Sequence, residues 1–531
     1  MQTLAAPPRL AGRHWVMLAG ACLAGFGLRV VALPHPPPGL WFDEALNGFN
    51  ALDVLAGRGS LYFARHGYPE EPLHMVAMAL VMKFAGVGEL SIRLTSAIAG
   101  TLALPFAFLC FREVFRSNQW ALLGTVLLAA MRWHVHFSRV GLRTIWVPAF
   151  ACAIAWLALR ALRRPDRRGA MALGLCTAAA MYTYLTARLI PLVLFALLVW
   201  DAMHRPWRRG LGVAIAVAAL ALGAGVAPLV IHLARNPDLL CGRVAEISLF
   251  GDAPPADDDA PPAALGQGRR VLNGVGENLV ANLAMFHTWG DHVPKHDIPR
   301  VPVFDPVTSA LMLAGLVTAL GQWSRTPGPP LLVLWLGTLL LASVLSFGAP
   351  NMLRTAGAAP AALGLVVLGL RRSTALVRHR WGGRAAFAFF VAWGCWFVLV
   401  EVTRYWEWGG RSDVWADFSG REHAVARSIL DDTRPGDRVF AFEGWFGHDA
   451  FALLTRDRAG VEPIATGPPV PALGVPEADQ PLHVYLLMDL APQRALRGAL
   501  IASPPSPRWR EEPLRGPDGR PFATHLIFEA P

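Results

Sequence analysis

The sequence is poor in charged residues and has few cysteines. Only 16% of its 531 residues are Asp, Glu, Lys or Arg, whereas 54% are hydrophobic. Soluble domains carry about a quarter charged residues, so this composition excludes an ordinary soluble fold. The six cysteines form no CxxC motif and no Cys/His metal spacing, which gives no support to a disulfide framework. We therefore predict a polytopic α-helical membrane protein.

Catalytic motifs of soluble enzymes are missing from the C-terminal region, residues 403–531. It has no Gly-rich phosphate loop, no GxSxG elbow and no metal-ligand spacing. Charged stretches such as REHAVARSILDD alternate with short apolar runs such as RVFAFEG and PLHVYLLMD, separated by Pro- and Gly-rich turns. This pattern predicts a small α/β domain that serves as a scaffold or binds a partner.

The positions of the positively charged residues indicate how the chain crosses the membrane. The net charge is +10, but most arginines stand between apolar segments, where they orient helices in a membrane and do not indicate nucleic-acid binding. A spanning helix needs about 20 apolar residues. Eleven segments of suitable length are candidates: 14–33, 92–111, 119–135, 145–162, 170–185, 188–203, 211–232, 305–323, 330–347, 353–370 and 385–402. Residues 73–82 are too short to span, so we expect an interfacial or re-entrant helix there.

The arginine clusters assign a side of the membrane to each loop. With residues 73–82 left out of the count, the clusters all fall on the side of Arg9 and Arg13, which the positive-inside rule places in the cytoplasm. The loops on the other side then lie outside the cytoplasmic membrane. The predicted organisation is a catalytic membrane domain with a first outer loop and a large outer loop, followed by an extracytoplasmic α/β domain: 1–402, 34–91, 233–304 and 403–531.

Two adjacent acids, Asp43 and Glu44, follow the first apolar segment in GLWFDEALNG. Apolar residues then recur at three-residue steps, which predicts an amphipathic helix along the outer interface: Leu46, Phe49, Leu52 and Leu55. Asp43 can be the N-cap of this helix, with Glu44 favoured by the helix dipole. Alternatively, Asp43 is a general base that takes a proton from a hydroxyl acceptor at the membrane surface. The two roles of Asp43 are compatible.

The stretches WFDEA, EEPLHMVAMALVMKFAGVGELSIRLTSAIAG, HFSRVGLRTIW and MYTYLTARLIPL follow one another in the membrane domain. Together they resemble the GT-C membrane glycosyltransferases, in particular the branch of protein O-mannosyltransferases and lipid A aminoarabinose transferase. The resemblance covers residues 14–370. It implies transfer of a sugar from a polyprenyl-phosphate carrier to an acceptor on the outer face, usually with inversion. It also implies that Asp43 is the catalytic base. In the first turn of a helix Glu44 points about 100° away from Asp43, so we expect Glu44 to tune the base or to contact the acceptor.

Loss of a phosphate leaving group builds negative charge, which cations stabilise in the transition state. Five arginines lie at predicted outer ends of helices, where the positive-inside rule disfavours them: Arg93, Arg139, Arg143, Arg188 and Arg354. Arg354, in APNMLRT at the start of the tenth predicted helix, is the first choice for the carrier phosphate, followed by Arg143 and Arg188. The alternative for each is a side chain that extends to lipid headgroups.

Aromatic rings and polar residues of the first loop are further candidates for substrate contacts. Rings stack on the apolar face of a sugar, although they also form interfacial belts; the rings in suitable places are Trp41, Tyr62, Tyr182 and Tyr184. In the first loop, His66 and His74 flank Glu70 and Glu71. The two histidines either orient the acceptor or are solvated, and Glu71 is a further substrate-binding candidate.

The large loop carries MFHTWGDHVPKHDIPRVPVFDP, which contains the residue types of a metal site. Prolines interrupt the segment, so no helix fixes His292 and His296 on one face. We therefore expect no metal and no cofactor. Asp291 remains a substrate-binding candidate, because this GD turn resembles a loop that closes over the donor in bacterial relatives.

Two other classes of function stay open. A transporter or flippase of lipid-linked sugars would place ionisable residues or broken helices near the bilayer midplane, whereas here the charges gather at the outer rim. A non-catalytic binding or assembly protein is the second alternative, because the C-terminal domain has no assigned motif. Under the glycosyltransferase reading, the partners are a polyprenyl-phosphate sugar, membrane lipids and a lipid, glycan or protein acceptor, with no nucleic acid.

Overall fold

The computed structural model describes residues 7–33, 35–65, 69–239, 247–250, 267–465, 481–502 and 508–529. The chain forms two compact units, and each is discontinuous in sequence. The helical unit comprises Met1–Val31, Ala56–Ala77 and Arg93–Tyr405, and the mixed unit comprises Ala32–Leu55, Met78–Ile92 and Trp406–Pro531.

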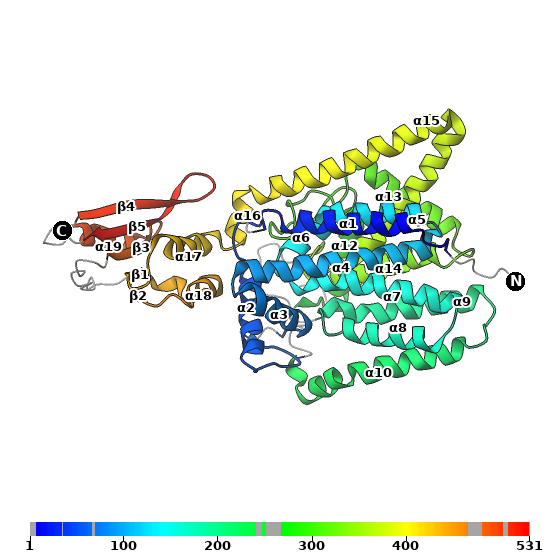
Figure 1. The fold of residues 1–531 in the computed structure, drawn as a ribbon, viewed down its shortest axis with the longest axis horizontal. Coiled ribbons are helices and arrows are strands. Elements are labelled where there is room, and N and C mark those ends of the chain that lie inside the picture. Colours follow the sequence, from blue (N-terminus) through cyan, green and yellow to red (C-terminus); the bar gives the residue numbers. More distant parts are fainter. Residues whose placement is uncertain are drawn as a thin grey trace. The chain divides into compact units, whose positions relative to one another are not determined.

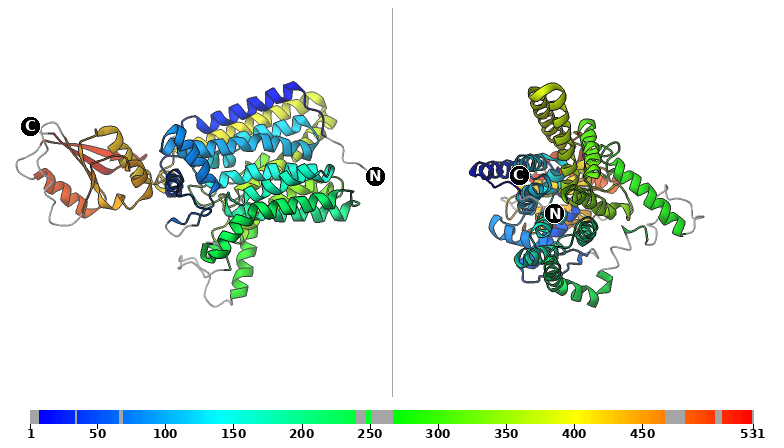
Figure 2. Two further views of the ribbon diagram at one scale, coloured as in Figure 1. Left: turned by 60° about the horizontal axis from the view of Figure 1, so that its bottom comes forward. Right: turned by 90° about the vertical axis from the view of Figure 1, so that its right-hand side faces the viewer.

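The helical unit is a bundle in which long apolar helices run side by side and are joined by shorter helical elements (Figures 1 and 2). In chain order they are α1 (Gly12–Val30), α4 (Glu89–Phe115), α5 (Asn118–Ala130), α6 (Arg132–Arg139), η2 (Arg143–Ile145), α7 (Trp146–Arg163), α8 (Arg167–Ala180), η3 (Leu185–Leu189), α9 (Ile190–His204), α10 (Leu211–Arg235), α12 (Gln267–Ala284), α13 (Pro306–Gly321), α14 (Gly328–Val344), η4 (Ala356–Ala358) and α15 (Ala359–Gly409). Each of the eleven predicted segments overlaps a helix, although the boundaries and the division into helices differ. Among the described residues, five helices are long and apolar enough to cross a membrane by length and composition.

Three local features differ from the predicted helices. The segment 119–135 breaks at Met131, because the Glu401 carboxylate accepts the backbone N–H of Arg132 at 2.5 Å and so supplies the partner that a continuous helix would provide. The last two predicted helices form one element, α15, with a kink at Gly382, whose φ of 85° is readily adopted by glycine. The large loop contains a helix, α12, that the sequence did not suggest.

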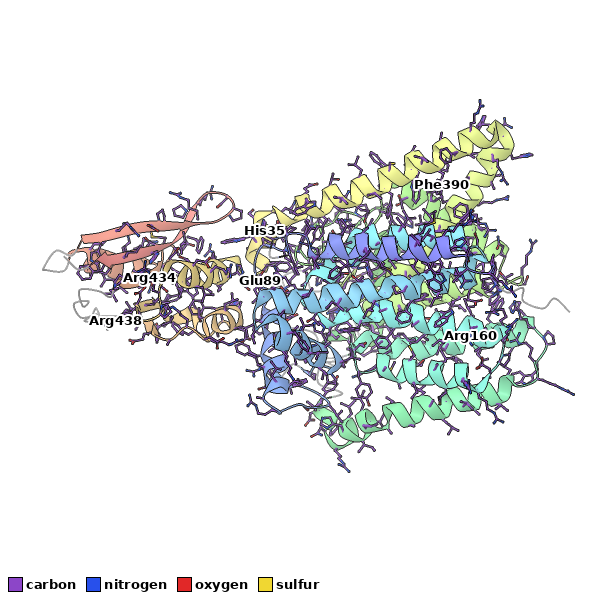
Figure 3. All side chains as sticks on the ribbon, in the orientation of Figure 1. His35, Glu89, Arg160, Phe390, Arg434 and Arg438 are labelled. Atoms are coloured by element: carbon purple, nitrogen blue, oxygen red, sulfur yellow. The ribbon has the colours of Figure 1, made fainter. Side chains whose placement is uncertain are left out.

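The arginine clusters between the helices meet at one end of the helical unit, as predicted. Arg112 donates to the Pro8 carbonyl at 2.8 Å, and Arg163 pairs with Glu113 at 2.6 Å. Arg371 donates to the carbonyl of Phe115 at 2.9 Å. Arg160, labelled in Figure 3, lies at the same end. We call this end the basic end.

The mixed unit contains the predicted α/β domain. Its five-stranded sheet has the order β2-β1-β3-β5-β4, with β1 parallel to β2 and β3, and β5 antiparallel to β3 and β4. The strands are β1 (Arg438–Phe442), β2 (Val461–Ile464), β3 (Leu482–Leu487), β4 (Arg508–Arg515) and β5 (Pro521–Glu529), and the helices are α16 (Ser412–Asp417), α17 (Gly420–Asp432), η5 (Glu443–Trp445), α18 (Asp449–Thr455) and α19 (Ala491–Ala502). Apolar side chains form a separate core on each face of the sheet.

The first outer loop contributes α2 (Phe42–Leu55) and much of α3 (Leu73–Ala85) to the mixed unit. The helical prediction for α2 is confirmed, but its apolar side packs on protein. Gly48 lies so close to Leu453 of α18 that an added Cβ would be 2.8 Å from its Cδ2. Figure 3 labels Glu89, whose carboxylate is 2.9 Å from Nε2 of His423 in α17. Two parts of the outer loop, Ala32–Leu55 and Met78–Ile92, therefore pack with the C-terminal domain in one unit.

Candidate active site

The two acids of α2 have different environments, and Glu44 is the one that closes the start of the helix. α2 begins at Phe42, so Asp43 is its second residue. The Glu44 side chain is fully buried, and its Oε2 accepts the backbone N–H of Trp41 at 3.0 Å. This contact is half of a capping box, in which the third helical residue reaches back to the N-cap. The predicted N-cap role of Asp43 is therefore wrong.

Asp43 is half-buried. Within the part of the chain that the structure describes, no hydrogen bond or ion pair engages its carboxylate. A carboxylate without a fixed partner can accept a proton from an incoming hydroxyl, whereas one that caps a helix is already engaged. Of the two acids, Asp43 is thus the one whose surroundings suit a general base.

A charged cluster lies in the helical unit and consists of Tyr62, Glu70, Glu71, Arg143 and Arg188. Arg143 forms ion pairs with Glu70 and, at 3.4 Å, with Glu71. Arg188 is 3.3 Å from Glu71 and donates to the Tyr62 hydroxyl at 2.8 Å. Backbone hydrogen bonds of 2.9 and 2.7 Å between Phe63 and Glu70 hold the loop in place. Sequence reasoning named four of these residues as substrate contacts but did not foresee that they pair with one another.

The pairing in the charged cluster neutralises its charges. Two arginines face two carboxylates, both nearly fully buried. Burial and the adjacent Glu71 carboxylate raise the pKa of Tyr62 to about 12, so this hydroxyl stays protonated at neutral pH. The Arg143 guanidinium also lies 5.5 Å from the ring centre of Tyr184, so it covers one face of this ring. A phosphate would have to compete with the carboxylates for either arginine.

The other polar candidates near this cluster have structural contacts. His74 is fully buried between the Trp146 indole N–H, 3.1 Å from Nδ1, and the carbonyl of Gly141, 3.3 Å from Nε2. Burial lowers the pKa of His74 to about 3, so it is neutral. Tyr182 donates to the Gly225 carbonyl at 2.9 Å and ties its loop to α10. His66 lies outside the described residues.

Arg354 lies in the loop between α14 and η4, before the helix in which the sequence placed it. Its Nη1 donates to the Ser346 hydroxyl at 2.6 Å and to the Phe347 carbonyl at 2.5 Å. The loop is also held by Asp291, which is fully buried and accepts the Met352 N–H at 2.7 Å. Asp291 accepts further hydrogen bonds from His296 at 2.8 Å and from the backbone N–H of Val293 at 2.9 Å.

These contacts give Asp291 a positioning role. Burial alone would raise its pKa, but the hydrogen bonds from His296 and from two backbone N–H groups outweigh burial and lower it. The ionised carboxylate thus joins the large loop to the loop that carries Arg354. Within the described residues, no group of three or more His, Cys, Asp or Glu side chains is arranged to hold a metal ion.

Two predicted substrate contacts are enclosed by protein. Arg139 is 1% exposed and donates to the carbonyls of Leu28 and Val31 at the end of α1, at 3.0 and 2.8 Å. It also donates to the Tyr405 hydroxyl at 3.1 Å. Arg93 is likewise buried. Carbonyls at a helix C-terminus favour a cation, so the position of Arg139 is explained without a ligand.

Sequence reasoning missed a second buried network in the helical unit, which contains Arg132, Asp297 and Glu401. Arg132 forms an ion pair with Asp297, and its backbone N–H is held by Glu401. Burial raises the pKa of Asp297 to about 6, opposed by Arg132. Arg29 in α1 is also fully buried, 2.8 Å from Nδ1 of His134. For Arg29, Arg132 and Glu401 the available signal was a charged residue inside a predicted span, whereas Asp297 lies in the predicted large outer loop.

Comparisons with known proteins identify a family and solved structures that this chain resembles. A family model described as dolichyl-phosphate-mannose-protein mannosyltransferase matches residues 68–232. Among solved structures, ArnT from Cupriavidus metallidurans bound to undecaprenyl phosphate is similar with a TM-score of 0.57 and 13% identity, over 98% of this chain and 100% of that chain. The chain has the GT-C fold. This confirms the resemblance found in the sequence.

A second solved structure supports the same fold. The oligosaccharyltransferase of Archaeoglobus fulgidus in its apo form has a TM-score of 0.51 and 14% identity, over 85% of this chain and 64% of that chain. No curated protein matches the sequence significantly. The shared fold and the long apolar helices of this chain fit a membrane-embedded, multi-pass protein.

Proposed function

We propose that this GT-C protein transfers a sugar from a polyprenyl-phosphate carrier to an acceptor hydroxyl on the outer face of the cytoplasmic membrane, with inversion. The observation that carries the proposal is the likeness over nearly the whole chain to ArnT bound to undecaprenyl phosphate. A fold alone does not fix a function. The separation of roles between Asp43 and Glu44 provides independent support.

In the proposed reaction, the Asp43 carboxylate takes the proton of the acceptor hydroxyl. The acceptor oxygen forms a bond with the anomeric carbon as the bond from that carbon to the phosphate oxygen breaks, and the electron pair leaves with the lipid phosphate. A positioned general base typically contributes roughly 10² to 10⁴ in rate. Glu44 keeps the start of α2 in place and is not consumed in this chemistry.

Arg354 is proposed to hold the carrier phosphate. Ser346 and Phe347 orient its guanidinium, and Asp291 fixes the loop from which it extends. Arg143 and Arg188 are weaker candidates for this role, because each already pairs with a buried carboxylate. Charge-assisted contacts to a phosphate gain strength where water is excluded.

The test is consumption of donor by the purified full-length protein. A polyprenyl-phosphate sugar is supplied with a mixture of lipid, glycan and peptide acceptors, and release of free polyprenyl phosphate is measured. A glycosyltransferase releases the lipid phosphate in step with sugar transfer. A flippase moves intact donor across a vesicle membrane without consuming it, and a binding protein does neither, so either result would overturn the proposal.

The proposed topology can be tested at two glycines. An added Cβ at Gly88 or Gly383 would meet no atom within 4 Å, so cysteine should be tolerated at both positions. We expect a membrane-impermeant thiol reagent to label Gly88→Cys in intact spheroplasts, and Gly383→Cys, near the kink of α15, only after permeabilisation. The unsubstituted protein controls for the native cysteines. The reverse pattern would invert the proposed orientation.

A further inference from the structure

The helical unit contains an apolar cavity that the proposed reaction does not use. It has a volume of about 320 Å³ and lies between α7, α8, α9 and α10. Leu162, Ala170, Leu198 and Ala214 are among its lining residues, and Thr177 is the one lining residue with a polar side chain. Such a cavity favours hydrocarbon over water.

Close packing of two helices explains the shape of the cavity. At Gly174 the backbones of α8 and α10 touch, since an added Cβ would lie 2.2 Å from the Ala218 carbonyl oxygen. At Gly225 an added Cβ would lie 2.6 Å from Cβ of Ala178. Small residues at such contacts allow membrane helices to approach closely. Alanines around the cavity then leave space that the side chains of α7 and α9 do not fill.

The cavity has the depth of one membrane leaflet. Along α10 its lining runs from Leu211 to Leu222, which at 1.5 Å per residue is about 17 Å. Half of a hydrocarbon core of about 30 Å is similar. Its lining begins at Leu211, the first residue of α10, and at Ala170, in the first turn of α8. These residues adjoin the basic end.

Two arginine-rich loops border the cavity at the basic end. The α7–α8 and α9–α10 loops are neighbours, because an added Cβ at Gly210 would lie 3.9 Å from Pro165. Among the described residues, eight arginines in and beside these loops lie near three acids, Glu113, Asp166 and Asp201. Five of them are exposed to solvent: Arg160, Arg164, Arg167, Arg168 and Arg209. Trp207 is 65% exposed beside them, as expected of an interfacial anchor.

We propose that this cavity binds one acyl chain of an anionic phospholipid, whose phosphate lies against Arg168, Arg209 and their neighbours. The excess of arginines selects the negative headgroup, and the apolar lining holds the chain. The site is separate from the proposed donor site, because Arg354 follows the end of α14 far from the basic end, where Gly328 starts that helix against Val114. The inference does not depend on the proposed function.

The test compares two lipids with the same acyl chains, dioleoyl phosphatidylglycerol and dioleoyl phosphatidylcholine. Binding to the full-length protein in detergent is measured by native mass spectrometry, with thermal unfolding as a second readout. We expect phosphatidylglycerol to bind more tightly and to raise the unfolding temperature more. Combining Arg168→Gln with Arg209→Gln should weaken phosphatidylglycerol about 30-fold, at the energy expected of two arginines near an anionic headgroup, and leave phosphatidylcholine unchanged.

Two further variants separate the headgroup from the chain. Ala161→Phe fills the cavity from α7 and should weaken both lipids. Arg378→Gln combined with Arg380→Gln removes two exposed arginines in α15, which lies on the opposite side of the helical unit from α10 (Figure 1), and should change neither lipid. Equal binding of the two lipids by the unsubstituted protein would overturn the proposal. The proposal would also be overturned if the α15 variant lost as much affinity for phosphatidylglycerol as the Arg168 and Arg209 double variant.

Discussion

The pair Asp43 and Glu44 in α2 and the pair Glu70 and Glu71 before α3 look alike in sequence but differ in their surroundings. In the first pair, Glu44 is buried against the Trp41 N–H and Asp43 has no partner within the described residues. In the second pair, both carboxylates are buried and both bind Arg143. Two adjacent acids therefore provide one available carboxylate in α2 and none in the charged cluster.

The comparison shows what decides whether a carboxylate can act as a base. A buried carboxylate needs cations or N–H donors as partners, and those partners occupy the oxygens that a substrate proton would need. Glu70 and Glu71 meet this requirement through arginines, and Glu44 meets it through a backbone N–H. Asp43 is half-exposed and, within the described residues, no fixed partner occupies its carboxylate.

The largest expected effect is on turnover by Asp43→Asn. Because Asp43 is not the cap of α2, the amide should leave the helix intact, with at most about 1 kcal/mol lost from the helix dipole. It cannot accept the proton, so transfer should fall roughly 10² to 10⁴-fold. Donor consumption measures this, with Asp53→Asn on the same helix as the matched control. Near-normal turnover by Asp43→Asn would leave Asp43 without a catalytic role.

Removal of Arg143 should affect stability most. Arg143→Met leaves Glu70 and Glu71 without their shared cation, and breaking a buried ion pair typically costs about 3 to 5 kcal/mol. Thermal unfolding in detergent would report the loss. Arg160→Met is the control, because its pair with Asp166 is about 44% exposed and 3.7 Å long, and exposed pairs contribute about 0 to 1 kcal/mol.

The Arg143 experiment also separates its two possible roles. Adding Glu70→Gln to Arg143→Met removes one of the stranded charges and should recover part of the lost stability. A phosphate ligand without a structural role would behave differently. Arg143→Met would then unfold at the normal temperature and lose only sugar transfer.

Arg354 should give a smaller loss of activity with little loss of stability. Losing one cation from a transferring phosphate typically costs roughly 100-fold in rate. Arg354→Ala should show this loss, and Arg354→Lys should recover part of it because lysine keeps the charge but not the two-pronged geometry. Ser346→Ala removes a partner of the guanidinium and serves as the control. If Ser346→Ala lowers turnover as much as Arg354→Ala, the arginine only braces its loop.

Much of the helical architecture was predictable, because apolar runs of about 20 residues separated by arginines leave few alternatives in a membrane. The break at Met131 was not, since it depends on Glu401, which is 269 positions from Arg132 in sequence. The sequence also did not predict that α2 packs on α18. A stripe of apolar residues indicates that a helix buries one side but does not indicate whether lipid or protein covers it.

The sequence predicted which residue types gather in the candidate site but not which of them pair with one another. The sequence placed arginines and acids together at one side of the membrane, and the structure pairs many of them. The prediction of a phosphate site with excess positive charge assumed that Arg143 and Arg188 have no acidic partner. In the structure, Glu71 contacts both arginines. Such pairs join residues more than 70 positions apart in sequence, so spacing along the chain carries no signal for them.

The smallest expected effect separates the cap from the base at Glu44. Glutamine also completes a capping box, so Glu44→Gln should keep the contact with the Trp41 N–H and lose little stability and little activity. Glu44→Ala removes the contact and should cost about 0.5 to 2 kcal/mol, the usual range for a lost cap. Thermal unfolding together with donor consumption distinguishes the two variants. If Glu44→Gln loses most of its turnover but unfolds at the normal temperature, Glu44 takes part in proton transfer. The role of general base would then be shared by Asp43 and Glu44.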